Sequence, residues 1–307
     1  MTRLGLGTAP LGNLYTEVSE DDAAATVAAA WAAGIRVFDT APLYGHGLAE
    51  RRLGAALRSY PRDEYVLSTK VGRLLVPGTP DGANGFKVSH GQVPRFDFSA
   101  DGVRKSLDES LTRLGLDRVD VALIHDPDNH LQQAINEAAP ALAALRDEGI
   151  VRAIGFGMNF VAPLNAAVER CDLDVILVAG RYTLLDQAAL DSGLLAACAD
   201  RGVAVMAGGV FNSGLLAAPN PSATFDYLPV AEERLAKALA IARVCERHGT
   251  SLPAAALRFV ADQPAIATVL IGARNGDEVR ADVAMLHEPV DPALWAALRA
   301  EGLLLLP

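Results

Sequence analysis

Short apolar runs alternate with amphipathic stretches along almost the whole chain, and this alternation predicts strands and helices in turn. The amphipathic stretches repeat apolar residues at helical spacing, as Val103, Leu107, Leu111 and Leu114 do. Ser19, with an acidic residue three positions later, is typical of a helix N-cap. The predicted strands cover residues 3–8, 35–39, 65–70, 119–125, 151–157, 174–179, 203–208 and 268–271. The predicted helices cover residues 19–33, 48–59, 99–115, 140–148, 161–170, 188–200, 230–247, 251–262, 277–286 and 292–299.

Eight successive strand–helix units predict a closed parallel (β/α)8 TIM barrel with extra C-terminal helices. A doubly wound open sheet is the main alternative for the same alternation. No linker divides the chain, so residues 1–307 are expected to form a single domain. Residues 77–97 interrupt the rhythm with three prolines and four glycines, and are predicted to be a long loop that covers the mouth of the barrel.

Polar residues stand where three consecutive predicted strands end. Asp39, Lys70 and His125 each close an apolar run, and Tyr44 follows Asp39 by five residues. The C-terminal ends of barrel strands form one rim, so these side chains are expected to meet there. Each residue alone also fits a structural role, such as a local cap for Asp39 or a satisfied buried histidine. The combination at successive strand ends favours a site.

The four side chains together suit proton transfer to or from a substrate oxygen. A nearby ammonium is expected to lower the pKa of a tyrosine, and a carboxylate keeps that ammonium charged and in place. Only four of the 27 basic residues are lysines, so Lys70 stands out in a chain that otherwise uses arginine. No nucleophile with its base accompanies the set. Carbonyl–alcohol interconversion with a hydride carrier therefore fits better than acyl transfer.

A metal-dependent barrel hydrolase is a competing interpretation. Four potential ligands lie close together in the sequence: His125, Asp126, Asp128 and His130. A barrel metal site draws ligands from several strands, and the first predicted strand, residues 3–8, offers neither histidine nor acid. We therefore expect no metal, and expect the two aspartates to shape the loop.

Composition narrows the class of protein. The formal net charge of −10 disfavours nucleic acids and anionic membranes as partners. No run reaches the roughly 18 apolar residues that a membrane span needs. Cys171, Cys198 and Cys245 are widely spaced and form no CxxC pair, which favours a reducing cytoplasm. A soluble cytoplasmic protein is expected, as a monomer or small homo-oligomer.

The motifs around these residues resemble those of the aldo-keto reductase family over nearly the whole chain. The family's signature is matched by Asp39, Tyr44-Gly45, Gly47, Glu50, Leu53 and Gly54, and its lysine and histidine by Lys70 and His125. The resemblance implies a (β/α)8 barrel that binds a nicotinamide cofactor without a Rossmann domain. It also implies that Tyr44 exchanges the proton, that Asp39 and Lys70 assist it, and that His125 orients the substrate.

The same resemblance implies a set of cofactor contacts. Asn159 would hold the nicotinamide carboxamide and Tyr182 would stack on the nicotinamide ring. The pyrophosphate loop would include Gly209, Phe211, Ser213 and Leu215, and the adenosine segment would include Gly272, Arg274, Glu278 and Asp282. Two departures from the family pattern are notable: Met158 replaces a serine before Asn159, and the lysine-serine pair of NADPH-selective members is missing. Glu278 would repel a 2′-phosphate, which favours NAD over NADP although Arg274 pulls the other way.

Residues 125–128 and 179–187 resemble the sugar-dehydrogenase branch of the family. That branch includes D-threo-aldose, L-fucose and L-galactose dehydrogenases and a pyridoxal 4-dehydrogenase. The implied reaction oxidises an aldose at C1 to its lactone, with Asn13, Asp126 and Arg181 binding sugar hydroxyls. The alternatives are a general aldehyde or ketone reductase, a pyridoxal 4-dehydrogenase and, more remotely, a cofactor-binding regulatory subunit.

Overall fold

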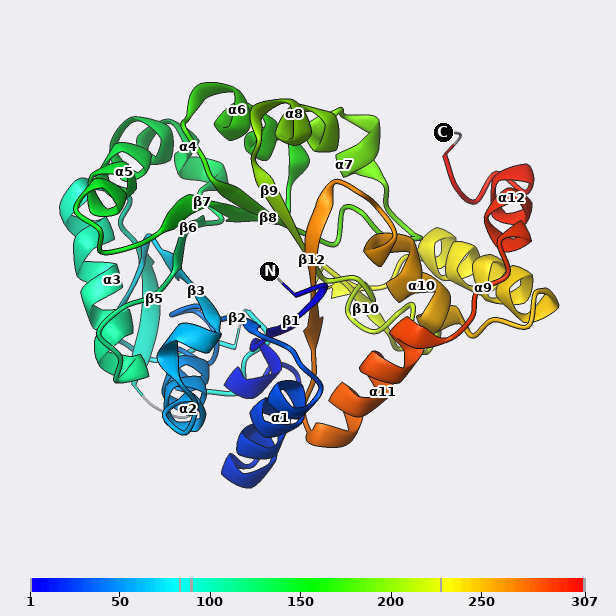
Figure 1. The fold of residues 1–307 in the computed structure, drawn as a ribbon, viewed down its shortest axis with the longest axis horizontal. Helices are drawn as coiled ribbons and strands as arrows, with labels where there is room; N and C mark the ends of the chain where they lie inside the picture. Colours follow the sequence, from blue (N-terminus) through cyan, green and yellow to red (C-terminus); the bar gives the residue numbers. More distant parts are fainter. Residues whose placement is uncertain (1, 83, 89–90, 227, 306–307) are drawn as a thin grey trace.

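A closed barrel of parallel strands forms the centre of the computed structural model, which describes residues 2–82, 84–88, 91–226 and 228–305 (Figure 1). Around the barrel the strand order is β1-β12-β9-β8-β7-β6-β3-β2. Both β2 and β12 pair with β1, which closes the sheet. The predicted TIM barrel is confirmed, and the doubly wound open sheet is excluded. The strands are β1 (Leu4–Gly7), β2 (Val37–Asp39), β3 (Val66–Val71), β6 (Val121–His125), β7 (Ala153–Met158), β8 (Val175–Ala179), β9 (Ala204–Gly208) and β12 (Ile266–Gly272).

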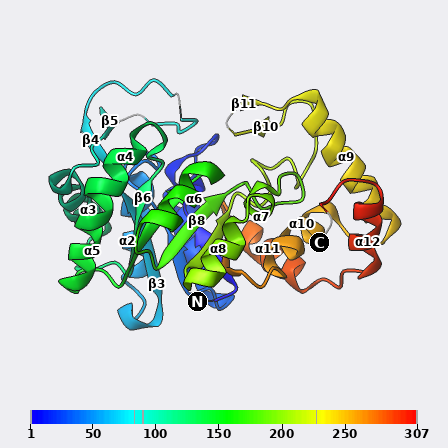
Figure 2. The same cartoon turned by 90° about the horizontal axis from the view of Figure 1, so that it is seen from above.

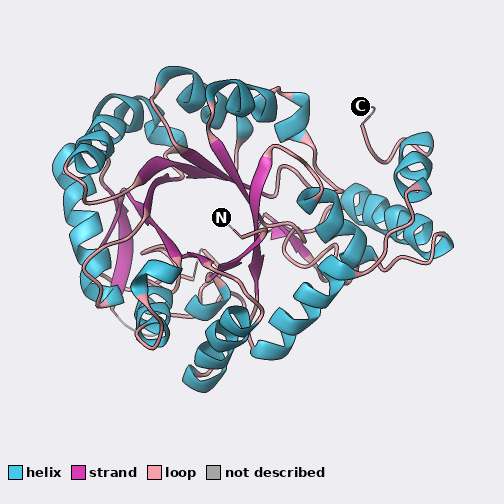
Figure 3. Ribbon diagram, in the orientation of Figure 1, coloured by secondary structure: helices cyan, strands magenta, loops and turns pink. Residues whose placement is uncertain are grey.

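Helices surround the barrel, and two of them extend to one side of it (Figures 1 and 3). The surrounding helices are α1 (Glu20–Ala32), α2 (Leu48–Leu57), α3 (Ala100–Leu114), α5 (Ala139–Asp147), α6 (Val161–Arg170), α7 (Ala188–Asp191), α8 (Leu194–Arg201), α10 (Leu252–Ala261) and α11 (Gly276–His287). The two that extend outward are α9 (Glu232–Arg247) and α12 (Ala293–Ala300). Ser19 caps α1 as expected, because its hydroxyl accepts a hydrogen bond from the Asp22 amide. No helix in the described ranges is long and apolar enough to cross a membrane.

The apolar side chains pack in three sets. One fills the barrel interior and includes Val37, Leu123, Leu177 and Leu270. The largest lies between the strands and the surrounding helices. A third joins α9 and α12 to the loop that follows β9. Alternate residues of each strand thus pack inward and outward, and the barrel is a filled core whose polar groups gather at one end.

The prediction that residues 77–97 form a long loop is partly wrong. β4 (Arg73–Pro77) pairs antiparallel with β5 (Gln92–Phe96), so the segment is a hairpin with a long tip. Pro94 hid the second strand from the sequence pattern, and it is tolerated there because β5 is an edge strand. Residues 83 and 89–90, within the same segment, lie outside the described residues.

Other departures are local. Residues 128–138 were not predicted as helical, but a 3-10 turn (Asp128–His130), α4 (Leu131–Gln133) and a π-helical turn (Ala134–Ala138) lead into α5. Gly193, with φ of +77°, divides the predicted helix at residues 188–200 into α7 and α8. A second small hairpin forms from β10 (Thr224–Phe225) and β11 (Leu228–Pro229).

Both hairpins lie at the end of the barrel away from the N-terminus (Figure 2). The tip of the β4–β5 hairpin is tied to the loop after β1. Leu14 forms a β-bridge with Phe86, the Tyr15 amide donates to the Gly85 carbonyl at 2.9 Å, and the Lys87 amide donates to the Asn13 carbonyl at 3.1 Å. The described part of this segment therefore extends over the C-terminal rim, as expected.

Helix α2 packs so closely on the end of α3 that Gly54 has no room for a side chain. A Cβ added at Gly54 would lie 1.9 Å from the Leu114 carbonyl oxygen. We expect Gly54→Ala to lower the free energy of unfolding by about 1–3 kcal/mol through overpacking, measured by urea denaturation. Helix propensity alone predicts the opposite sign, a gain of roughly 1 kcal/mol. A stabilised Gly54→Ala protein would contradict the packing argument, and the exposed neighbour substitution Ala55→Gly calibrates the propensity term.

Candidate active site

A buried ammonium lies at the centre of the C-terminal rim. Lys70 Nζ donates hydrogen bonds to Asp39 Oδ2 at 2.7 Å, to the Thr40 carbonyl at 2.9 Å and to the Tyr44 hydroxyl at 3.0 Å. Lys70 is 1% exposed and Asp39 is 2% exposed. Three acceptors for three ammonium protons satisfy the cation fully, which a charge removed from water requires.

The pairing register of β2 with β3 brings Asp39 and Lys70 together. Asp39 is the last residue of β2 and pairs with Ser68 of β3. Lys70 lies two residues beyond Ser68 on the same face, so its side chain points into the barrel and reaches up to Asp39. Gly157 on β7 lies next to it, and a Cβ there would be in ordinary van der Waals contact with Lys70 Cε, at 3.4 Å.

Tyr44 is held by a contact between two loops. A Cβ at Gly12 would lie 2.5 Å from the Tyr44 carbonyl carbon, and one at Gly45 would lie 2.4 Å from the Gly12 carbonyl oxygen. The loop after β1 therefore supports the turn that carries Tyr44. The Tyr44 ring is flanked by Phe86 and His125, each with its ring centroid 5.9 Å away. All four residues of the predicted quartet (Asp39, Tyr44, Lys70 and His125) thus lie in one cluster.

The electrostatics differ from the expectation for Tyr44. Burial raises the pKa of the Tyr44 hydroxyl above its usual value, and the attraction of Lys70 lowers it only in part, so the expected lowering is wrong for this structure. Burial disfavours the charged form of Lys70, but Asp39 and Tyr44 together outweigh it and raise the Lys70 pKa. The resting pair is therefore an ammonium that donates to a protonated phenol.

His125 is neutral for related reasons. Burial, followed by the positive charges of Arg73 and Lys70, lowers the pKa of its imidazole well below 6.5. Its Nε2 lies 3.5 Å from Asp126 Oδ2, and Asp126 is itself paired with Arg73 at 2.8 Å. A neutral imidazole can donate one hydrogen bond to a substrate oxygen without carrying a charge.

A cavity of about 210 Å³ adjoins this cluster. Its wall combines charged and amide groups with apolar and aromatic side chains: Leu43, Arg73, Asn84, Phe86, Asp126, Asp128, Asn159 and Phe160. The predicted quartet contacts this lining through Phe86, which packs on Tyr44, and through Asp126 beside His125. Small size and mixed polarity suit a small substrate with several polar groups.

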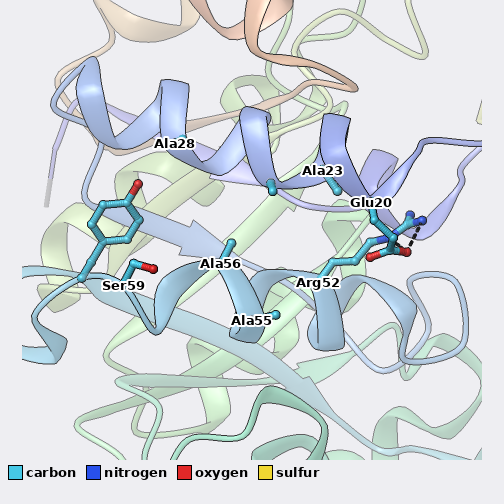
Figure 4. Close-up of a pocket in the computed structure, with 9 residues that line it drawn as sticks. Glu20, Ala23, Ala28, Arg52, Ala55, Ala56 and Ser59 are labelled. Carbon is cyan, nitrogen blue, oxygen red and sulfur yellow. Dashed lines mark hydrogen bonds and ion pairs between the residues drawn. The ribbon is translucent and has the colours of Figure 1, made fainter.

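A second cavity, of about 380 Å³, lies between α1 and α2 on the outside of the barrel (Figure 4). Alanines line most of it, and the ion pair between Arg52 and Glu20, at 2.8 Å, closes one end. Both helices lie outside the strands, so this cavity is separate from the quartet.

The buried carboxylate of Glu50, through its contacts with Thr69 and Arg113, supports the quartet. Glu50, fully buried on α2, accepts from the Thr69 hydroxyl at 2.8 Å and from Arg113 Nε at 2.5 Å. Thr69 precedes Lys70 on β3, so the Glu50–Arg113 ion pair is bonded to the strand that carries Lys70. It lies on the helix side of that strand. Glu50 and Gly54 were identified only as family-signature residues, and Arg73 and Gly12 were not identified, since their roles depend on contacts between distant loops.

The predicted cofactor residues lie at or after the ends of β7, β8, β9 and β12, whereas the quartet lies at or after the ends of β2, β3 and β6. Asn159 follows β7 and lines the cavity described above. Gly209 and Ser213 are exposed on the turn after β9, and Phe211 is half-buried. Leu215 is buried in the apolar set that joins this turn to α9 and α12. Asn212, which was not singled out, anchors this turn by donating from Nδ2 to the Gly180 carbonyl at 3.2 Å.

Gly272 ends β12 at the same rim and leads into α11, whose first turn is capped by Asn275. The N-terminus of a helix there suits a phosphate group. Arg274 donates to Glu278 at 2.6 Å and 3.0 Å, so the two charges neutralise each other. Asp282 is buried one turn further along, and burial with the nearby Glu278 raises the pKa of its carboxyl to about 7.

The residues at this rim fit a dinucleotide. Exposed glycine and serine backbone, an amide side chain in the cavity and a helix N-terminus follow one another along the ends of β7, β9 and β12. One buried acceptor in this stretch, Asn212 Oδ1, has no hydrogen-bond partner among the described residues. Such an orphaned group is what a bound ligand would satisfy.

Tyr182 is not placed as expected. Its hydroxyl accepts from Gln263 Nε2 at 3.1 Å and its ring stacks on Phe259 of α10 with centroids 5.0 Å apart. The side chain belongs to the apolar layer between strands and helices. A tyrosine that satisfies both its ring and its hydroxyl there is held outside the barrel wall, so this placement does not support stacking on a nicotinamide.

All three expected sugar-binding residues have contacts within the chain, and of the three only Asp126, which is paired with Arg73, also lines the cavity. Asn13 Oδ1 accepts from the Val18 amide and from Arg52, each at 3.0 Å. Arg181 is paired with Asp226 on the β10–β11 hairpin at 2.6 Å. Among the described residues no group of three histidines, cysteines or acids could hold a metal ion. Within the proposed ligand set of the competing hydrolase, His130 lies against Phe96 and Phe98.

Comparison with known proteins agrees with this geometry. The model of the aldo/keto reductase family matches residues 3–301. D-threo-aldose 1-dehydrogenase from a Pseudomonas species is 42% identical over 99% of this chain and 95% of that protein. Pyridoxal 4-dehydrogenase from Microbacterium luteolum is 38% identical over 99% of this chain and 95% of its own. Among solved structures, the glycerol dehydrogenase from Gluconobacter oxydans superposes with a TM-score of 0.78 at 26% identity, covering 98% of this chain and 91% of that one.

The low pKa of His125 can be measured directly. We expect the imidazole proton resonances of His125 to stay constant between about pH 6 and 8, because the ring is already neutral there. Arg73→Gln removes a positive neighbour and should raise the pKa, so the titration moves to higher pH. Assignment by comparison with His125→Gln identifies the signal in an NMR titration. A His125 midpoint near 6.5 in the unmodified protein would contradict the described electrostatics.

Proposed function

We propose, from the premise that the chain belongs to the aldo/keto reductase family, that this NAD(P)-dependent oxidoreductase oxidises an aldose at C1 to its lactone. The observation that carries the proposal is the Tyr44 hydroxyl, held 3.0 Å from the buried Lys70 ammonium beside a small cavity with polar and aromatic walls. The relative that is 42% identical and named D-threo-aldose 1-dehydrogenase supports the choice of substrate class.

The nicotinamide, when bound, accepts the hydride that leaves C1. The remaining steps belong to the chain. The C1 hydroxyl proton passes to the Tyr44 oxygen while the C1–O bond becomes a carbonyl, so the cyclic hemiacetal becomes a lactone. Neutral His125 donates a hydrogen bond to the same oxygen and orients it. For this step Tyr44, which is protonated at rest, must first release its own proton to water. Lys70, kept charged by Asp39, stabilises the resulting phenolate until it accepts the proton of the C1 hydroxyl.

In the reverse direction, when a reduced nicotinamide supplies the hydride, the same groups assist the reduction of an aldehyde. The raised pKa of Tyr44 keeps its hydroxyl protonated in the resting protein, so it is ready to donate to a carbonyl oxygen. Asn159 and the turn at residues 209–215, with the segment from Gly272 to Asp282, would hold the dinucleotide across the rim. Tyr182 has no part in this assignment because of its position against α10.

Oxidation of pyridoxal is a second candidate. Phe86 and Phe160 give the cavity aromatic walls, which suit a planar ring. The 38% identity to a pyridoxal 4-dehydrogenase supports the same candidate. The polar floor of Arg73, Asp126 and Asp128 favours the sugar.

The function is tested with a substrate panel and one variant. We expect NADH to form with at least one of L-fucose, L-galactose and D-arabinose, and more slowly or not at all with pyridoxal. Tyr44→Phe should lower kcat by roughly 10² to 10⁴, the usual worth of general acid–base catalysis, with little change in cofactor binding. Absorbance at 340 nm measures turnover and quenching of protein fluorescence measures binding. Turnover retained by Tyr44→Phe would refute the proton-transfer role, and pyridoxal as the only substrate would select the second candidate.

The preferred cofactor is tested at the adenosine end. We propose that NAD is preferred, because Glu278 occupies Arg274 and would repel a 2′-phosphate. Glu278→Gln should free Arg274 and improve binding of NADPH relative to NADH by roughly tenfold, the value of one charge-assisted contact, in a fluorescence titration. The control is Asp277→Asn, which breaks the neighbouring pair with Arg280 and should leave the ratio unchanged. Equal affinities in the unmodified protein, or tighter NADPH, would overturn the preference.

A further inference from the structure

The cavity beside the quartet contains a charged pair that proton transfer does not require. We propose that Arg73 and Asp126 form a recognition subsite for a hydroxyl on the carbon next to the reacting carbon, so that the enzyme selects 2-hydroxy aldehydes and the aldoses related to them. The inference deepens the proposed function, because it needs the carbonyl chemistry of the quartet but not the oxidation of a particular sugar.

The backbone at Asp126 brings its side chain into the cavity. Neighbouring residues of a strand normally point to opposite faces, so a residue after His125 would be expected to face outward. Asp126 instead has φ of +41°, a left-handed conformation that is unfavourable for a residue with a side chain. Its amide donates to the Gly157 carbonyl at 3.0 Å, and its Oδ2 comes within 3.5 Å of His125 Nε2. The side chains of these adjacent residues thus lie next to each other, and Asp126 lines the cavity.

Arg73 completes the subsite from the other side. It begins β4, is 9% exposed, and donates from Nη2 to Asp126 Oδ2 at 2.8 Å. Its guanidinium carbon lies 4.9 Å from the Phe96 ring centroid, a cation–π contact. Its Nε is buried and has no hydrogen-bond partner among the described residues.

A second orphaned group lies on the same wall. Asp128 Oδ1 is buried, and within the described chain it also has no hydrogen-bond partner. Both Arg73 and Asp128 line the 210 Å³ cavity. Buried donors and acceptors are rarely left unpaired in native proteins, so an unpaired donor and an unpaired acceptor on one small cavity point to a polar ligand.

The ligand chemistry follows from the groups present. Arg73 is a donor and the aspartates are acceptors, and a hydroxyl is the small neutral group that pairs with both kinds at once. A carboxylate at this position would be repelled by Asp126 and Asp128, and a hydrogen or methyl would leave Arg73 Nε unpaired. Asp126 lies within 3.5 Å of Nε2 of His125, the residue that is proposed above to orient the reacting oxygen, so the recognised hydroxyl is assigned to the adjacent carbon.

Three aldehydes separate this hydroxyl from every other feature of the substrate. Propanal, 2-hydroxypropanal and 3-hydroxypropanal have the same carbon chain and differ only in the presence and position of one hydroxyl. With NADH as reductant, we expect kcat/KM for 2-hydroxypropanal to exceed that for propanal by roughly 10- to 100-fold, the worth of a hydrogen bond to a charged group. The value for 3-hydroxypropanal should stay close to that for propanal.

Variants assign the preference to the pair. In Asp126→Asn and in Arg73→Gln the 2-hydroxypropanal to propanal ratio should fall to near one. The ratio is the readout because any change transmitted to His125 affects both substrates alike. Asp172→Asn, which breaks the exposed pair with Arg146 far from the cavity, should leave the ratio unchanged. Circular dichroism and NADH binding verify the fold, and Arg73→Lys provides a second variant that retains the charge.

The outcomes are distinct from those of the proposed function. A ratio near one in the unmodified enzyme, or a high ratio that survives in both Asp126→Asn and Arg73→Gln, would overturn the subsite. If the ratio behaves as expected but no aldose is oxidised, the subsite stands and oxidation at C1 fails. If aldoses are oxidised but the ratio is near one, oxidation at C1 stands and the subsite falls.

Discussion

The ammonium of Lys70, buried inside the barrel, is the constraint around which the rest of the rim is arranged. A charge with 1% exposure is tolerated only if every proton is accepted, and the three acceptors, Asp39, Thr40 and Tyr44, come from one short segment at the end of β2. Removing one partner of such a buried pair typically costs roughly 3–5 kcal/mol, because the other charge remains uncompensated. The close loop contacts at Gly12 and Gly45 and the ion pair behind β3 keep these acceptors in position. Structure and chemistry therefore depend on the same interaction.

The charged groups of the rim form two pairs, Lys70 with Asp39 and Arg73 with Asp126. Near Lys70, Tyr44 stays protonated because burial outweighs attraction, and His125 stays neutral because burial and two cations oppose its protonation. Asp126, paired with Arg73, carries the negative charge nearest the imidazole. The Lys70–Asp39 pair and the Arg73–Asp126 pair share no residue. A substrate can therefore contact the Arg73–Asp126 pair while its reacting oxygen contacts the quartet. A substitution in the Arg73–Asp126 pair acts on recognition directly, and it also reaches the chemistry through the pKa of His125, which Arg73 lowers.

Two hairpins lie at the mouth of the barrel. The β4–β5 hairpin contributes Arg73 and, through its tip, Phe86, which packs on Tyr44. The β10–β11 hairpin is joined to the rim by the Arg181–Asp226 pair. Binding residues placed on connections over a rigid barrel are expected, since the barrel holds the reacting groups while the connections vary.

The sequence by itself determined the barrel, the order of its strands along the chain and the cluster of Asp39, Tyr44, Lys70 and His125. These follow from local patterns, because periodicity sets each element and a strand's last residue must lie at the rim. Only the tertiary structure decided the roles of Arg73, Gly12 and Tyr182. Arg73 meets Asp126 across 53 residues of chain, and Tyr182 turns from the rim because Phe259 and Gln263 lie beside it. The raised pKa of Tyr44 belongs to the same class, since burial is a sum over all packed neighbours and no local pattern contains it.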